Sequence, residues 1–149
     1  IEGFFAAFMK EESRGQPKII EAAGNHVLSD HNAPVISILN MASIKDLERV
    51  NQKPVDPIRF RANLWFEGTA PWHEFEWIGK KIAVGDVTLA VTDRITRCAA
   101  THVNPATAER DMNIVKTLQM GFRHTEFGVY AKVESTGRIN VGDTLNSPT

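Results

Sequence analysis

The only cysteine of the chain, Cys98, has the most distinctive chemistry in the sequence. A lone thiol forms no disulfide within its own chain and cannot complete a zinc site by itself. Its chemistry is therefore that of one thiolate, which acts as a nucleophile, as a carrier of sulfur or as one ligand to a soft metal. The alternative is a buried structural thiol that packs as a small hydrophobic side chain. The residues around Cys98 bear on this choice.

A row of polar side chains is predicted on a strand that precedes this cysteine. Residues 59–66 alternate in character, and successive side chains of a strand point to opposite faces. This pattern places Arg59, Arg61 and Asn63 on one face. Two guanidinium groups, each a fixed fork of donors, and an amide suit an anion or a polar heterocycle. The alternative, which the pattern leaves open, is a solvated strand face with surface ion pairs.

The same alternation groups Arg94, Thr96 and Cys98 on one face, with His102 added if the strand continues. A nearby cation favours the reactive thiolate. Arg94 lies about 13 Å from Cys98 in an ideal strand, which is too far for direct help. We therefore expect the cation to come from another strand, and the row that contains Arg61 is the candidate.

Other classes of site find little support in the sequence. The histidines have no His-Glu-x-x-His spacing and there is no Cys-x-x-Cys pair, so we expect no zinc site and surface or loop positions for His26, His31, His73, His102 and His124. A Cys–His hydrolase pair can be drawn between Cys98 and His102, but no protease signature surrounds it. Glycines form no phosphate-binding loop, and the tryptophans lack the interleaved basic residues of a single-strand nucleic-acid site.

The composition is that of one ordinary globular domain. The 149 residues are 42% hydrophobic and 23% charged, with a formal net charge of -1. This charge gives no general attraction to nucleic acid or to an anionic membrane, and no apolar stretch is long enough to span a bilayer. One cysteine fits a reducing compartment, so we expect a cytoplasmic protein. The chain starts without Met, as if within a helix, so we expect an N-terminal portion to lie outside it.

Short strands dominate the predicted secondary structure. The clearest signal is a hairpin of strands 81–84 and 87–91 joined at Gly85-Asp86, with the second strand continuing through Cys98. Helices are predicted near residues 4–12, from Ser43 with Asp46 as its capping-box partner, and after a cap at Asp111. Further strands are expected at 18–22, 35–39, 59–66, 129–133 and 139–141, with a loop at 24–34. This order predicts a mainly β domain, a β-barrel with a few short α-helices.

Several motifs in a fixed order closely resemble the MOSC domain, the C-terminal domain of molybdenum-cofactor sulfurases. The resemblance covers about residues 35–145 of the single domain expected over residues 1–149, and it rests on order and spacing more than on any one motif. The motifs are Arg59-Phe-Arg61-Ala-Asn63-Leu, Gly79 with Ile82-Ala-Val-Gly85-Asp86, Arg97-Cys98-Ala-Ala-Thr101-His-Val-Asn-Pro105-Ala-Thr107, Arg110-Asp111, Phe127-Gly-Val-Tyr130 and Val141-Gly142-Asp143.

The resemblance implies a β-barrel that binds the molybdenum cofactor, molybdopterin. In members with reductase activity, such as the mitochondrial amidoxime-reducing component, the matching cysteine is a thiolate ligand to molybdenum. Cys98 is thus the expected metal ligand and catalytic residue. Arg61 and Asn63 match residues that line the cofactor, Thr101 lies beside the metal-binding loop, and a stretch near Asn40 to Ser43 matches a further lining segment. The expected cofactor-binding residues are Arg59, Arg61, Asn63, Thr101, Ser43 and Asp111.

Three functions are consistent with these residues. The favoured one is reduction of N-hydroxylated or related small substrates, with an electron-transfer protein as partner. The second is sulfur transfer, in which Cys98 carries a persulfide beside a pyridoxal-phosphate-dependent cysteine desulfurase. The third is a binding module without catalysis. None of them implies a nucleic-acid or membrane partner.

The chain departs from the family pattern in two positions and in extent. The family usually has aspartate where this chain has Asn104, and often a second threonine where it has His102. The full-length bacterial relatives carry an N-terminal β-rich portion that supplies basic residues to the cofactor phosphate. We expect this portion to be missing from the present chain, and with it part of the cofactor's binding energy.

Overall fold

The computed structural model describes residues 1–9, 15–21, 31 and 33–148. The chain divides into two units, residues 1–34 and 35–149, and each is described by itself. In the first unit the predicted helix is present as α1, Glu2–Met9, while residues 18–21 form no strand. The predicted loop 24–34 lies largely outside the described residues. None of the helices described is long and apolar enough to cross a membrane.

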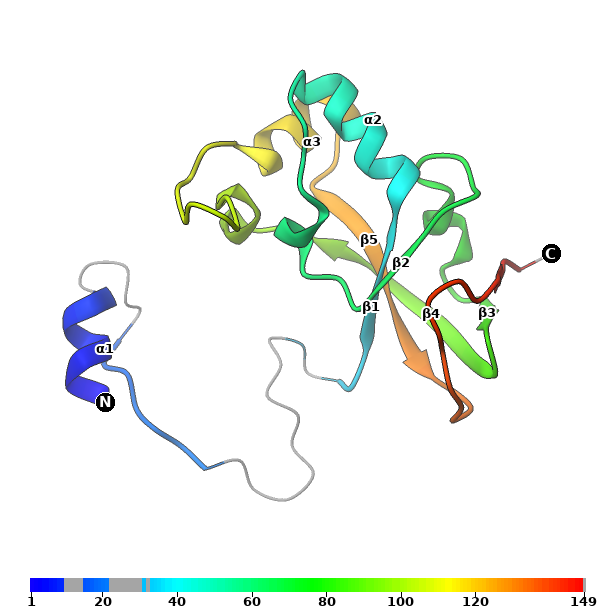
Figure 1. Ribbon diagram of the computed structural model, residues 1–149, viewed down its shortest axis with the longest axis horizontal. Coiled ribbons are helices and arrows are strands. Elements are labelled where there is room, and N and C mark those ends of the chain that lie inside the picture. The colour runs from blue at the N-terminus through cyan, green and yellow to red at the C-terminus, as the bar shows by residue number, and fades with distance from the viewer. Residues whose placement is uncertain (10–14, 22–30, 32, 149) are drawn as a thin grey trace. The chain divides into compact units, whose positions relative to one another are not determined.

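The second unit is built on one curved, barrel-like sheet (Figure 1). The strand order over the described residues is β2-β1-β5-β4-β3-β6, and every neighbouring pair is antiparallel except β1 and β2. The predicted hairpin is confirmed, with Val84 opposite Val87. The mainly β fold with few short helices is confirmed as well. The strands are β1 (Ile36–Asn40), β2 (Leu64–Phe66), β3 (Lys81–Val84), β4 (Val87–Thr96), β5 (Glu126–Val133) and β6 (Leu145–Asn146).

Two α-helices, α2 (Met41–Asn51) and α3 (Ile114–Phe122), pack side by side against the sheet (Figure 1). Both predicted caps were wrong. The side chain of Asn40 accepts the backbone N–H of Ala42, so Ser43 lies inside α2, and Asn113 rather than Asp111 caps α3 by accepting the N–H of Lys116. Asparagine competes well with serine and aspartate as an N-cap, and in both cases it stands closest to the helix.

Alternating side chains of the strands divide the core into two clusters. Ile38 of β1 packs within an inner cluster of sheet residues, and its neighbour Leu39 packs beneath α2 and α3 in an outer cluster. Both side chains are fully buried. The inner cluster also contains Phe66, Trp77, Ile82, Val84, Val87, Leu89, Val91, Val129 and Ala131, and the outer one Ile44, Leu47, Val55, Phe60, Ile114, Leu118 and Phe127.

Strand β5 changes faces at Gly128. Phe127 packs in the outer cluster, stacked on Phe60 at 4.3 Å between ring centroids, whereas Val129 packs in the inner one. In a regular strand these two residues, two positions apart, would share a face. Gly128 has φ +77°, a left-handed conformation that glycine adopts without a steric cost. This local change also aims the carbonyl of Phe127 at the side chain of Arg97.

The predicted strand 59–66 was wrong in its first half. Residues Pro57–Phe60 form a 3-10 helix, η2, and Arg61 ends it with φ 51°. Proline suits the first turn of a helix, and the side chain of Asp56 caps this one by accepting the N–H of Ile58. Pairing with β1 starts only at Leu64. Arg59, Arg61 and Asn63 therefore do not share a strand face.

Two other strand predictions were also corrected. Strand β4 ends at Thr96, and the next residues form a second 3-10 helix, η4 (Ala99–His102), so His102 does not continue the face of Cys98. Residues 139–141 form no strand; the chain pairs with β3 only at β6. A third 3-10 helix, η3 (His73–Trp77), carries the buried Trp77.

Candidate functional site

Cys98 lies at the surface on a backbone that is held in place. The N–H of Arg97 donates to the carbonyl of Thr125 at 2.9 Å, which ties the chain to β5 just before the cysteine. The carbonyl of Cys98 accepts the Thr101 N–H at 3.2 Å and the Thr101 hydroxyl at 2.9 Å. Thr101 is buried, while Cys98 is exposed. The alternative of a buried structural thiol is therefore wrong, and the thiol is open to a ligand.

The side chain of Arg97 joins the turn of Cys98 to the turn of Arg61. Its Nη1 donates to the carbonyl of Phe60 at 3.0 Å, and its Nε and Nη2 donate to the carbonyl of Phe127 at 2.8 and 2.5 Å. Since Phe60 directly precedes Arg61, this one guanidinium fixes the backbone beside both candidate residues. Arg61 itself is exposed, and its side chain bonds to none of the described residues. Sequence analysis missed Arg97 because alternation placed it on the face away from Cys98.

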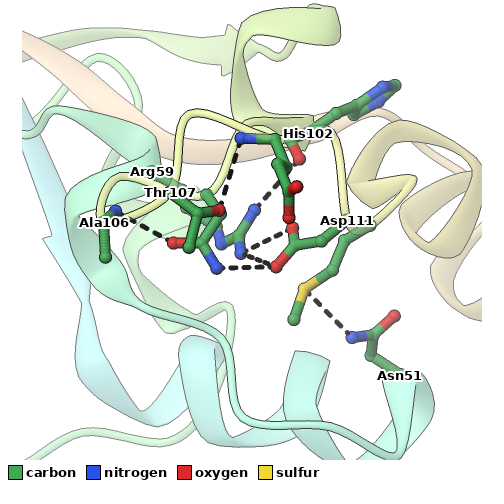
Figure 2. Close-up of polar contacts among 9 residues, drawn as sticks. Asn51, Arg59, His102, Ala106, Thr107 and Asp111 are labelled. Atoms are coloured by element: carbon green, nitrogen blue, oxygen red, sulfur yellow. Dashed lines mark hydrogen bonds and ion pairs between the residues drawn. The ribbon is translucent and has the colours of Figure 1, made fainter.

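Arg59 and Asp111, two of the predicted cofactor-binding residues, bind each other (Figure 2). Arg59 is 6% exposed; its Nη2 lies 2.7 and 2.8 Å from the two carboxylate oxygens of Asp111, and its Nη1 donates to the carbonyl of His102 at 3.1 Å. Asn104 donates to Asp111 at 2.8 Å. Desolvation is the largest single influence and raises the pKa of Asp111, but the hydrogen bonds from Asn104 and Arg59, with the charge of Arg59, outweigh it and lower that pKa.

This contact accounts for the amide at position 104. A carboxylate there would face the carboxylate of Asp111, so Asn104→Asp is expected to lower the thermal midpoint at neutral pH, where Asp111 is ionised. Part of the loss should be recovered as the pH falls and the added carboxyl is protonated. Differential scanning fluorimetry across this range measures both effects. Asn104→Ser removes the same hydrogen bond without adding charge, and an Asn104→Asp protein as stable as this control would contradict the expectation.

His102 faces helix α3. Its Nε2 accepts the N–H of Val115, in the first turn of α3, at 3.5 Å, so this nitrogen acts as an unprotonated acceptor. Desolvation, followed by the charge of Arg110, lowers the pKa of His102. The ring nitrogen is engaged with the start of the helix, and this contact gives a Cys–His hydrolase pair no support.

Ser43 belongs to a separate buried cluster around Glu74. Its hydroxyl donates to Glu74 at 3.0 Å and accepts the N–H of Trp72 at 2.8 Å, and Asn40 donates to the other carboxylate oxygen at 2.9 Å. Glu74 is fully buried, and desolvation raises its pKa more than these hydrogen bonds lower it. The flanking aromatic residues of η3 were the one signal in the sequence for this buried acid.

Glu74→Gln is expected to remove a loss of stability with rising pH. The folded pKa of Glu74 is raised, so its contribution to the free energy of unfolding is fully present below the unfolded value near 4.5 and is lost as the pH rises through the folded value. The amide is uncharged at every pH and keeps an acceptor for Asn40. Urea unfolding from acid to neutral pH should therefore give a flatter profile than the parent. Glu76→Gln, at an exposed position, is the control. If the stability of Glu74→Gln falls with rising pH as steeply as that of the parent, the raised pKa assigned to Glu74 is contradicted.

Asn63 lies beside an apolar cavity. Its carbonyl oxygen accepts both the N–H and the hydroxyl of Ser37 at 2.8 Å, which fastens it to β1. The cavity has a volume of about 350 Å³ and is lined by Asn63 together with Ile36, Leu64, Val87, Leu89, Val133, Thr136, Gly137 and Ile139. Val87 and Leu89 start the strand that Cys98 follows, so the cavity and the thiol lie toward opposite ends of β4.

The structure thus divides the predicted residues among four places. Cys98, Thr101 and the backbone of Arg61 come together through Arg97, while the Arg59–Asp111 pair stands beside the same turns. Asn63 lies beside the apolar cavity, and Ser43 lies in the buried cluster around Glu74. No group of three or more His, Cys, Asp or Glu side chains able to hold a metal ion occurs in the part of the chain that the structure describes.

Comparison with known families gives a match to the MOSC domain over residues 25–146, most of the chain. The chain belongs to the MOSC domain family. Among similar proteins, mitochondrial amidoxime-reducing component 1 of Mus musculus is 27% identical over 95% of this chain and 44% of its own length. The molybdenum cofactor sulfurase of Caenorhabditis elegans is 29% identical over 75% of this chain and 16% of its own. This MOSC domain therefore spans less than half the length of these relatives.

A solved structure supports the fold. The crystal structure of YiiM from Geobacillus stearothermophilus matches with a TM-score of 0.55 and 19% identity, covering 76% of this chain and 54% of that one. Together the comparisons confirm the resemblance to the MOSC family and include a relative, the sulfurase, that is named for the molybdenum cofactor.

Proposed function

We propose that this MOSC domain holds the molybdenum cofactor, with Cys98 as the thiolate ligand to molybdenum, and serves the reduction of N-hydroxylated or related small substrates. The observation that carries the proposal is the pairing of two turns. One presents the exposed Cys98, and the other presents the guanidinium of Arg61, which has no partner among the described residues; Arg97 bonds the two turns together. Similarity to the mouse amidoxime-reducing component supports the reaction class.

The side chains available suit such a group. A thiolate is a soft donor of the kind that molybdenum favours. The free guanidinium of Arg61 matches an anionic phosphate or the polar edge of a pterin, to which arginine donates in a fork. When bound, the cofactor would supply the redox chemistry, and these residues would position it.

The other predicted residues take supporting places in this proposal. Thr101 fixes the carbonyl of Cys98, and the Arg59–Asp111 pair fixes η2 and the loop after η4. Ser43 lies apart from these turns, in the buried cluster around Glu74. These side chains are engaged with protein partners, as Asn63 is with Ser37, so we assign direct contact with the cofactor to Cys98 and Arg61.

The reaction requires a partner. Reduction of an N-hydroxyl group to the parent nitrogen compound consumes two electrons and two protons and releases water. The protein side chains described here supply no electrons, so an electron-transfer protein is proposed as the donor.

A second function is supported by the same thiol. An exposed cysteine on a fixed backbone suits a persulfide carrier, and the nematode sulfurase is a relative. In this alternative a pyridoxal-phosphate-dependent cysteine desulfurase adds one sulfur atom to Cys98, and no metal is bound.

Two measurements on the full-length protein separate these functions. Expression in a host that makes the molybdenum cofactor, followed by metal analysis and an assay with an N-hydroxylated substrate, tests the first. Mass spectrometry after incubation with a desulfurase tests the second. Protein without molybdenum that gains one sulfur atom on Cys98 would replace the first proposal with the second.

A further inference from the structure

We propose that Arg59 and Arg97 form a reciprocal clamp that fixes the turn of Arg61 against the turn of Cys98. Arg59 and Arg97 are then positioning residues, whose action on the cofactor runs through Arg61 and Cys98. The part of this inference that concerns the cofactor rests on the proposed function. The geometry of the clamp does not.

The first half of the clamp is Arg97. It directly precedes Cys98, and its guanidinium reaches across to the carbonyl of Phe60, which directly precedes Arg61. The same guanidinium lies over the Phe60 ring, 5.2 Å from its centroid, and its other nitrogens donate to the carbonyl of Phe127. Three donors of one planar group thus hold the end of η2 and the start of β5 at once, a geometry that a lysine ammonium cannot reproduce.

The second half is Arg59, which reaches in the opposite direction. It lies two residues before Arg61, and its guanidinium donates to the carbonyl of His102, four residues after Cys98, and pairs with Asp111 (Figure 2). Arg59 therefore holds the far end of η4 to η2, as Arg97 holds the near end. Each of the two turns contributes one arginine and one backbone carbonyl that accepts a hydrogen bond from the arginine of the other turn. The two turns are therefore joined at two points, one on either side of Cys98.

This crossing explains why Arg59 and Arg97 stand beside the candidate site without being free to bind a ligand. Arg59 is 6% exposed and bonded at both terminal nitrogens, and Arg97 is bonded at all three. Their guanidinium groups donate to backbone carbonyls and to one carboxylate. The guanidinium of Arg61 is left exposed on a turn whose backbone is fixed.

A distance measurement tests the clamp without any cofactor. Cys98 is the only cysteine of the chain, so Arg61→Cys adds a second labelling site without background. Spin labels at these two positions should give a narrow distance distribution in pulsed EPR of the 149-residue chain. Adding Arg97→Lys or Arg59→Lys should broaden it at least twofold. Arg94→Lys is the matched control, because Arg94 lies in β4, the strand that leads to Cys98, but stacks on Phe75 and bonds neither turn among the described residues.

Unchanged widths in both Arg97→Lys and Arg59→Lys, with the circular dichroism of the parent, would overturn the clamp. Arg97→Met and Arg59→Met remove the donors altogether, and unchanged widths in these folded proteins would also overturn the clamp. The second readout is molybdenum content and the Mo(V) EPR signal of the full-length protein. We expect at least tenfold lower content or shifted g values in Arg97→Lys, and neither change in Arg94→Lys. Broadened distances in a protein that never binds molybdenum would keep the clamp and reject the proposed function.

Discussion

The full-length protein with Cys98→Ser is expected to lose molybdenum-dependent reduction by more than about 100-fold, beyond the loss typical of residues that only support a metal ligand. Serine keeps the size and the exposure of the side chain but replaces a soft sulfur donor by a hard oxygen that is protonated at neutral pH. The turnover of an N-hydroxylated substrate and the molybdenum content of the purified protein are the measurements. The fold should be unaffected, because the exposed thiol packs in neither core cluster.

Ala99→Ser is the control for this variant. Residue 99 is exposed on the same turn, so the substitution adds a hydroxyl beside the site without touching the thiol. It should retain activity near the parent level. Parent-level turnover in Cys98→Ser would remove Cys98 from the reaction and, with it, the proposed ligand.

Gly128→Ala is expected to lower the free energy of unfolding by about 2–5 kcal/mol, from a left-handed backbone and a steric clash together. The φ of Gly128 is +77°, and a Cβ placed there would lie 2.6 Å from the carbonyl oxygen of Ile38 on the paired strand β1. A backbone atom in a central strand pair cannot move aside as a flexible side chain does. Typical domains have only about 5–15 kcal/mol of stability in all, so the loss is severe. Urea denaturation measures it.

Gly79→Ala separates the two causes. Gly79 has nearly the same φ, +78°, but a Cβ there would meet no heavy atom within 4 Å. Its substitution should therefore show only the backbone cost, about 1–2 kcal/mol. Equal losses at the two glycines would mean that the contact with Ile38 is relieved without cost. A larger loss at Gly128 should be accompanied by disorder at the Cys98 turn, since Arg97 bonds the carbonyl of Phe127 next door.

Local patterns in the sequence were sufficient for much of the fold. The hairpin at Gly85-Asp86, the strand at 35–39 and the helix near Ser43 were predicted because turn chemistry and side-chain periodicity are properties of neighbouring residues. The family motifs added the fold class and identified Cys98 as the candidate ligand. The mainly β architecture therefore needed no long-range information.

The prediction of a strand over residues 59–66 was wrong in its first half because a local pattern does not show which segments pair. Alternation over residues 59–66 is a real pattern, but Pro57 and the Asp56 cap wind the first half into η2, and only the part that pairs with β1 is a strand. A period of two tells which side chains would share a face if a strand formed. It does not tell whether a partner strand is there to form it.

By itself the sequence predicted one thiol as the candidate for the chemistry and guanidinium groups near it. Only the tertiary structure decided which guanidinium is available to a ligand. Those of Arg59 and Arg97 donate hydrogen bonds to carbonyl and carboxylate acceptors 30 to 52 residues away in the sequence. A backbone carbonyl is present in every residue and leaves no mark on the sequence. The acceptors of a buried arginine are therefore set by how distant turns meet in space.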